Sequence, residues 1–203
     1  MRNDVGRIPG RGRVLRAIYR STFAPQEVVG DPTTLTFVLR YGWVLIVVRW
    51  AYYSLLFQFR DYHGRWTPFV APPFGLSLDS YASLQRSLSL PFGLVLMAAL
   101  ALVLVAYLRL IGRPLRFLDA YNVLGVAFFL PFVLVQPVDQ IVIALVGWQL
   151  VPVTVIHTAV LFWESWAAMR IISGLAGLTR AHEFTGGLLV CAVWIAITGV
   201  VWR

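Results

Sequence analysis

Titratable residues inside long apolar segments are the places where this sequence could carry chemistry. His157 and Glu164 are seven residues apart, so they share one face of a helix about 10 Å apart along its axis. Two metal ligands on one helix are usually three or four residues apart. The spacing therefore favours a hydrogen bond from His157 to a neighbouring helix. The alternative is a haem or pigment held by His157 together with a ligand from a partner chain.

Arg49 is the costliest residue to place in a membrane, because an arginine at the centre of a transmembrane helix costs about 2.5–3.5 kcal/mol to insert. Acceptors at a similar depth are the side chain of Gln149 and the carbonyl of Trp148, which loses its usual donor to Pro152. We expect Arg49 to bond to these groups, without a charged partner, and so to join two helices. The alternatives are an anion or lipid-headgroup site at Arg49, and snorkelling of its side chain to the surface.

Patterns of catalytic residues are lacking. The sequence contains no Gly-rich phosphate loop, no carboxylate pair at a useful spacing and no serine elbow. Asp119 and Asp139 stand at the two ends of one apolar segment and are interpreted as boundary residues. Cys191, the single cysteine, excludes an internal disulfide and a multi-cysteine metal site. The sequence therefore predicts a non-enzymatic protein without a cofactor or a metal.

Composition indicates what surrounds these residues. Of the 203 residues, 59% are hydrophobic and 13% charged, whereas soluble domains carry about 45–50% apolar and about 25% charged residues. So few polar residues cannot cover a surface in water, and a disordered chain is excluded by the same numbers. The arginines mark the ends of apolar runs and form no basic face interleaved with aromatic residues, which argues against nucleic-acid binding. We expect an integral membrane protein.

Five apolar segments are long enough to cross about 30 Å of hydrocarbon as helices of about 20 residues. They cover approximately 37–59, 87–108, 120–138, 140–163 and 184–202. They do not alternate in polarity as the strands of a membrane barrel do. The predicted fold is thus an all-α, polytopic transmembrane bundle of five helices over 37–203. The third and fourth spans are separated only by the turn QPVDQ, and residues 60–86 form a long external loop around WTPFVAPPFG.

The distribution of arginines predicts the orientation of this bundle. Twelve of the 17 arginines fall on the side of the N-terminus, four on the other side, and Arg49 between them. Because positive charge is retained on the cytoplasmic side, the N-terminus is expected there and the C-terminus on the opposite side. All 17 cations are arginine rather than lysine, which favours a GC-rich prokaryote and hence its cytoplasmic membrane.

Residues 1–36 are expected to form a basic cytoplasmic arm that contains a short amphipathic helix. At 100° per residue, one side of RVLRAIYR carries arginines and the opposite side carries apolar residues. The arginines are Arg13, Arg16 and Arg20. Such a helix would lie on the anionic cytoplasmic surface of the bilayer. The alternative is that these arginines serve only as orientation signals.

Two stretches of the second half resemble a known family. GRPLRFLDAYNVLGVAFFLPFVL is a short basic loop that leads into a helix with a central proline, and LFWESWAAMRIISGLAGLTRAHEFTGGLLVCAVW contains a Gly-Leu break, a short His-containing turn and a last span. In spacing and hydropathy, over most of the chain, this resembles the Yip family (the Yip-one domain). The N-terminal YRSTFAPQEVVGD is similar to the start of its prokaryotic members. The resemblance implies a five-helix fold with a cytoplasmic N-terminus and brings no catalytic residues. The acidic-Leu-Tyr-Gly-Pro motif of eukaryotic members is absent, so their small-GTPase contacts do not carry over.

Three functions compete at this point. A membrane scaffold or accessory subunit that binds other membrane proteins within a larger complex demands least of the sequence and is preferred. A small-molecule or ion permease, or its membrane component, should bring several polar residues together at the midplane, where Arg49, Gln149, Thr154 and His157 qualify. A cofactor- or pigment-holding subunit of an electron-transfer or light-harvesting assembly would depend on His157.

Overall fold

The computed structural model describes residues 11–62, 75–146 and 150–201, and within these ranges the chain is helical and contains no strand. The helices are α1 (Arg11–Phe23), η1 (Pro25–Glu27), α2 (Pro32–Tyr62), α3 (Leu78–Leu110), α4 (Phe117–Ala127), α5 (Phe129–Val146), α6 (Leu150–Ala176) and α7 (Arg180–Val201). The all-α fold class is confirmed.

Four helical segments of the described residues are long and apolar enough to cross a membrane. They are Pro32–Leu55, Asp79–Leu110, Phe117–Asp139 and Arg180–Gly199. Each overlaps one of the expected spans, namely the first, second, third and fifth. In length and composition, these segments are those of an integral membrane protein.

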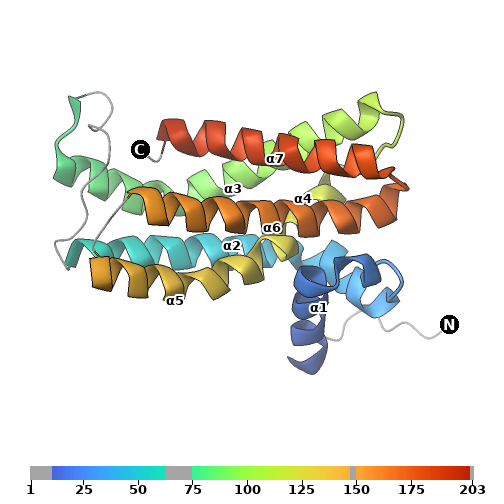
Figure 1. Cartoon of the computed structure of the whole chain (residues 1–203), viewed down its shortest axis with the longest axis horizontal. Helices are drawn as coiled ribbons and strands as arrows, with labels where there is room; N and C mark the ends of the chain where they lie inside the picture. Colours follow the sequence, from blue (N-terminus) through green and yellow to red (C-terminus); the bar gives the residue numbers. More distant parts are fainter. Residues whose placement is uncertain (1–10, 63–74, 147–149, 202–203) are drawn as a thin grey trace.

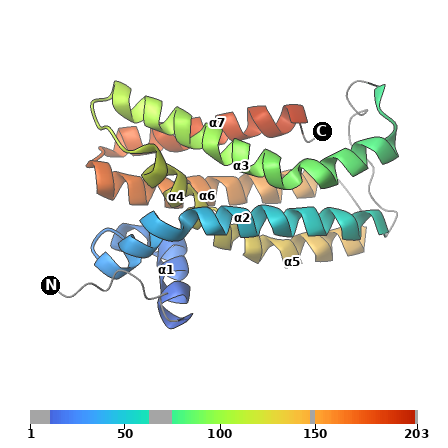
Figure 2. The ribbon, with the colours of Figure 1, turned by 180° about the vertical axis from the view of Figure 1, so that it is seen from behind.

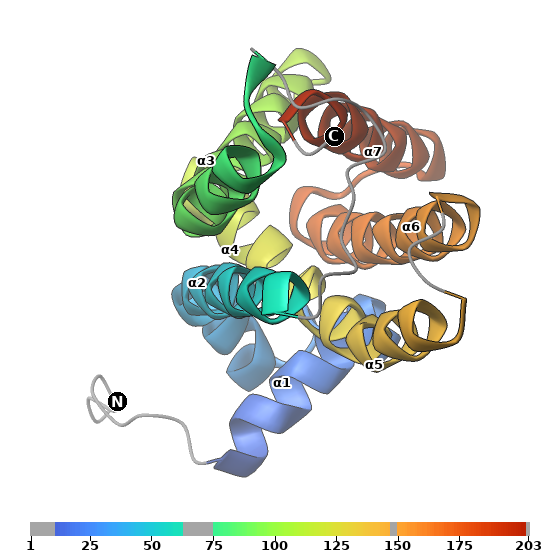
Figure 3. The ribbon, with the colours of Figure 1, turned by 90° about the vertical axis from the view of Figure 1, so that its left-hand side faces the viewer.

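The long helices lie side by side with their axes roughly aligned, as Figure 1 shows, and α1 lies crosswise at the end where α2 begins. Viewed from behind, α3 runs along α2 in the opposite direction (Figure 2), and the two helices are in extensive contact. The view along the bundle shows α7 beside α3 and α6, on the side away from α1 (Figure 3). Helix α1 packs against α2, α4, α5 and α6.

The turn expected at QPVDQ is wrong. Helix α5 continues through Pro137 to Val146, and α6 then extends from Leu150 to Ala176, well beyond the expected end of that span at residue 163. A proline removes only one helical hydrogen bond, and a helix in lipid tolerates this because an open turn there would expose more unpaired backbone groups. The connection falls at residues 147–149, so Trp148 and Gln149 lie outside the described residues.

The external loop expected over 60–86 is shorter at both ends. Helix α2 continues to Tyr62, and α3 begins at Leu78, where the side chain of Ser77 caps it by accepting a hydrogen bond from the Ser80 amide. Most of the proline-rich WTPFVAPPFG lies outside the described residues. The second span therefore begins about two turns before the predicted residue 87.

Helices α2 and α4 cross at their glycines. A Cβ atom added at Gly42 would overlap the backbone of Asn122, and one added at Gly125 would overlap the backbone of Gly42. The Asn122 side chain donates to the Leu39 carbonyl at 2.8 Å and accepts from the Trp43 amide at 2.7 Å. Close backbone approach of this kind is typical of helices packed within membranes. It brings α4 and the following break at Phe128 against the middle of α2.

Candidate functional site

Arg49 and Glu164 form an ion pair inside the helix bundle. Arg49 lies in the middle of α2 with only 4% of its surface exposed, and Glu164 lies in the middle of α6 and is also buried. Arg49 Nη1 lies 2.6 Å from Glu164 Oε1, and Nη2 donates to Oε2 at 3.4 Å. The two guanidinium nitrogens thus face the two carboxylate oxygens, the geometry that gives arginine–carboxylate pairs their strength.

A backbone carbonyl and three aromatic rings complete the surroundings of Arg49. Its Nη1 also donates to the carbonyl oxygen of Phe128, the residue between α4 and α5. The guanidinium carbon lies 4.7 Å from the ring centre of Phe132, 5.3 Å from that of Trp194 and 5.5 Å from that of Phe128. Rings at these distances attract a cation through their electron-rich faces. Arg49 therefore contacts α4–α5, α6 and α7 from its place in α2.

The carbonyl that Arg49 uses lies at a break in the helix. Pro131 has no amide hydrogen to donate to the carbonyl four residues earlier, and its ring crowds that carbonyl. Helix α4 accordingly ends at Ala127, and α5 begins at Phe129. The carbonyl freed by Pro131 is that of Ala127, and the next carbonyl, that of Phe128, is the one that accepts from Arg49 at this break. The acceptor therefore comes from α4–α5, whereas the expected acceptors were Trp148 and Gln149.

The expectation that Arg49 has no charged partner is wrong. It depended on the turn at QPVDQ, which put Glu164 near the cytoplasmic end of its helix. Because α6 begins at Leu150, Glu164 lies instead at the level of Arg49. The other expected acceptors, Trp148 and Gln149, lie outside the described residues.

His157 and Asp139 form a second pair, between α6 and α5. His157 Nε2 lies 2.7 Å from Asp139 Oδ2. This confirms the helix-to-helix hydrogen bond expected for His157 and occupies one of its two ring nitrogens. Asp139 is buried within α5, which continues past QPVDQ to Val146. Its interpretation as a boundary residue is therefore wrong. Asp119, in contrast, lies in the first turn of α4, where Arg116 donates to it at 2.8 Å.

Buried polar atoms without partners adjoin this second pair. Both side-chain polar atoms of Gln136 and the Oδ1 atom of Asp139 have no hydrogen-bond partner among the described residues. Gln136 and Asp139 are three residues apart on α5 and therefore share a face. Unpaired polar atoms in a low-dielectric interior cost about 1–3 kcal/mol each, so water or a ligand is expected to satisfy them.

The arginines expected at the membrane surface separate into two groups. Arg13 and Arg16 are exposed on α1. Arg20 instead binds Asp31 at 2.5 Å, just before α2, and lies 3.9 Å from Glu27. Leu15, Tyr19 and Phe23 are exposed on α1 beside the arginines. The helix thus presents both charged and apolar side chains away from the bundle.

Asp31 joins α1 to the start of α2. The Thr34 hydroxyl donates to its carboxylate at 2.8 Å, and the backbone amides of Thr34 and Thr33 donate to it as well. Together with Arg20, these hydrogen bonds hold the pKa of Asp31 below its usual value of 3.8. Asp31 therefore remains charged in the folded protein at neutral pH.

The described residues contain no group of three or more His, Cys, Asp or Glu side chains that could hold a metal ion. No family model, curated protein or solved structure matches this chain.

Proposed function

We propose that this protein is a non-enzymatic integral membrane scaffold or accessory subunit that binds other membrane proteins within a larger complex. The observation that carries the proposal is the Arg49–Glu164 pair. Its two charges are directed at each other and at neighbouring helices, and they tie α2, α4–α5 and α6 into one block. A bundle joined in this way offers its outer helix faces for binding.

The outer faces fit that role. Large apolar side chains are exposed on each long helix, for example Val95 and Leu102 on α3 and Phe184 and Ile195 on α7. Within a bilayer such faces contact either lipid or the helices of other membrane proteins. Of the four candidate spans, α7 has the smallest buried share, which suits a helix at the edge of a larger assembly.

The proposed topology has five spans, with α6 as the fourth, and a cytoplasmic N-terminus in a prokaryotic cytoplasmic membrane. The 27 residues of α6 extend about 40 Å, more than a bilayer core requires, and α6 lies among the other long helices. The asymmetry of the arginines supports the orientation, and so does the resemblance to the Yip family. Alkaline phosphatase fused after residue 203 should be active and a green fluorescent protein fused there dark, and the reverse result would contradict the topology.

Purification in mild detergent at native expression level tests the scaffold role. We expect at least one membrane protein to co-purify in a fixed ratio and to be crosslinked by photoreactive residues placed at Val95 or Ile195. A photoreactive residue at buried Leu100 is the control and should capture no partner. If the chain purifies without a partner, and if neither Val95 nor Ile195 gives a crosslink, the proposal is contradicted. An absorption spectrum of the same sample separates the cofactor-holding alternative, which requires a coloured protein.

A permease, or its membrane component, is the second candidate, because of the polar atoms at Gln136 and Asp139. Polar side chains buried in a membrane bundle without partners are typical of a path for water or a polar solute. Proton flux, measured with a pH-sensitive dye in proteoliposomes, tests this function. Permeation predicts a flux that Gln136→Leu abolishes and that the exposed control Gln26→Leu leaves unchanged. No flux above protein-free liposomes would exclude proton permeation.

A further inference from the structure

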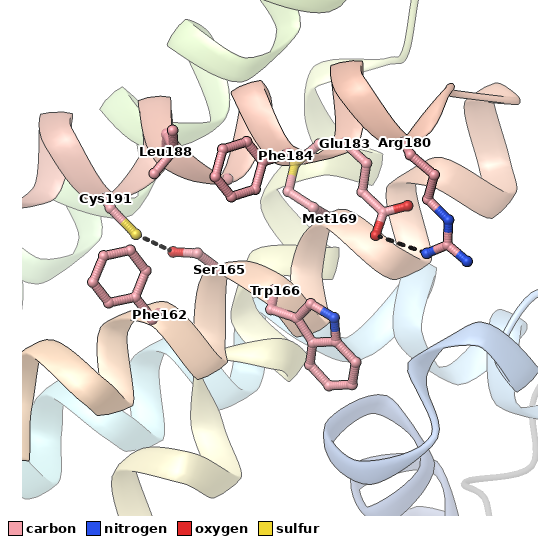
Figure 4. Close-up of a pocket in the computed structure, with 10 residues that line it drawn as sticks. Phe162, Ser165, Trp166, Met169, Arg180, Glu183, Phe184, Leu188 and Cys191 are labelled. Carbon is pink, nitrogen blue, oxygen red and sulfur yellow. Dashed lines mark hydrogen bonds and ion pairs between the residues drawn. The ribbon is translucent and has the colours of Figure 1, made fainter.

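A groove runs along the outside of the bundle between α6 and α7 (Figure 4), with a volume of about 390 Å³. Side chains from α6 form one wall and side chains from α7 the other. The walls are mostly apolar, with Phe162 and Leu188 toward one end and Arg180 and Glu183 at the other. An open apolar groove in a membrane protein is filled by lipid or by another helix.

The length of the groove matches one leaflet of a bilayer. Along α7 it extends from Arg180, the first residue of the helix, to Cys191. The eleven helical steps between these two residues correspond to about 16 Å, and half of a hydrocarbon core is about 15 Å. At the deep end, the Cys191 thiol contacts the Ser165 hydroxyl at 3.2 Å across the two helices. The groove therefore extends from the membrane surface to about the midplane and ends there.

Positive charge gathers at the mouth of the groove. Glu183 lies 3.3 Å from Arg170 and 3.8 Å from Arg180, so one carboxylate faces two guanidinium groups. The guanidinium of Arg113 lies at the turn between α6 and α7, close to Gly177. The Arg180 side chain is 78% exposed and can turn toward a ligand. Two arginines share one carboxylate, and Arg113 adds a further positive charge at the adjacent turn, so the mouth has a net positive charge at the level expected for lipid phosphates.

We propose that this groove binds an anionic phospholipid from the leaflet on the side where α7 begins. One acyl chain lies along the groove toward Cys191, and the phosphate contacts Arg180. A transmembrane helix from a partner would need a groove through both leaflets, whereas this groove ends near the midplane. The inference requires that α6 and α7 lie in a membrane, and it does not depend on the scaffold role.

Native mass spectrometry of the purified full chain tests the proposal, with phosphatidylglycerol and phosphatidylcholine as the added lipids. The wild-type protein should bind one phosphatidylglycerol more tightly than any later one. Gly187→Leu fills the groove, since a Cβ atom there has only an ordinary contact with Met169, and should weaken this first binding by at least about tenfold. The matched control is Gly199→Leu on the same helix, where a Cβ atom meets nothing within 4 Å. Equal affinity of Gly187→Leu and Gly199→Leu for the first phosphatidylglycerol would overturn the proposal.

The charge of the headgroup is tested by Arg180→Gln. Loss of a charge-assisted contact should weaken phosphatidylglycerol binding about tenfold. Phosphatidylcholine binding should weaken less, because its choline cation offsets the charge of its phosphate. Arg16→Gln, on α1 at the other side of the bundle, is the control for unspecific attraction of anionic lipid. Equal affinity of the wild-type protein for the two lipids would overturn the anionic assignment. A dimer of the chain that Gly187→Leu dissociates would overturn the lipid assignment altogether.

A phosphatidylglycerol with a photoreactive group in the middle of its acyl chain gives a readout without substitutions. Crosslinks should concentrate on peptides that contain Phe162 and Leu188. Crosslinks spread evenly over the exposed residues of α3, such as Val95 and Leu102, would contradict a specific groove.

Discussion

A buried arginine in a membrane bundle is tolerated when its charge and most of its donors find partners at the same depth. Arg49 finds a carboxylate, a carbonyl and three aromatic rings, drawn from helices that are distant in sequence. The net contribution of such a pair to stability can be small, because both charges lose their hydration. The loss of one partner is costly, however, because the other remains buried and uncompensated.

Arg49→Leu is therefore expected to lower the free energy of unfolding by more than the sequence alone suggests. With neutral acceptors alone, its replacement by an apolar residue should be almost neutral. With Glu164 as the partner, the substitution leaves a buried carboxylate beside apolar side chains.

Asp31 predicts a pH dependence at the contact between α1 and α2. Because its pKa is lowered in the folded state, its contribution to stability is complete above its unfolded value of 3.8 and is lost as the pH falls through the folded value. The melting temperature of the wild-type protein should exceed that of Asp31→Asn at pH 6, and the difference should shrink toward pH 3. Thermal unfolding in detergent, followed by circular dichroism, measures both. A difference that does not change with pH would argue against a charged Asp31 at this contact.

Helix contacts at glycine are the feature that sets the spacing of α2 and α4. Gly42→Ala places a methyl group against the Asn122 backbone, and the strain should lower the free energy of unfolding by about 1–3 kcal/mol. Gly199→Ala on α7 is the matched control, because a Cβ atom there meets nothing within 4 Å. Unfolding titrations in mixed micelles compare the two variants. Equal stability of both would show that the α2–α4 crossing does not require a glycine.

Helix α1 has three faces, which together predict where it lies. Ala17, Ile18 and Ser21 are buried against the bundle, and the exposed Leu15, Tyr19 and Phe23 recur every four residues on a second face. The arginines occupy the third face. Since α1 lies crosswise to the bundle (Figure 1), these faces suit a helix in the plane of the membrane surface.

Nitroxide labels measure this placement in a Cys191→Ser background, which removes the single cysteine. A label at Leu15→Cys should be more accessible to oxygen than to a water-soluble nickel complex, as expected for a shallow position within the bilayer. A label at Arg13→Cys should be more accessible to nickel. Equal and high nickel accessibility at both positions would place α1 in water.

At the scale of the whole molecule, the sequence was informative about helices and uninformative about their ends. Long apolar runs predicted four of the spans that are found, and the spacing of arginines in RVLRAIYR predicted the helix at α1. The residues of QPVDQ predicted a turn where the helix in fact continues, because a proline in an apolar run need not end a helix that has no water to bond to.

That one error explains most of what the sequence missed at the site. The turn predicted at QPVDQ placed the fourth span about ten residues too early in the sequence. That placement separated Glu164 from Arg49 and put Asp139 at a membrane surface. Pairing between residues 115 apart in sequence depends on how the helices align, and helix alignment depends on where turns fall. The break at Phe128 had a visible signal in Pro131, which follows it.

Arg49 and Glu164 form one structural unit between α2 and α6. The decisive experiment is a double-mutant cycle with Arg49→Leu and Glu164→Leu, in which the free energy of unfolding is measured in mixed micelles. Each single variant is expected to lose about 3–5 kcal/mol, and the double variant less than either, because it leaves no unpaired charge. If a leucine variant fails to fold, Glu164→Gln provides a milder version of the same comparison. Additive losses, with the double variant the least stable of the three, would contradict the claim.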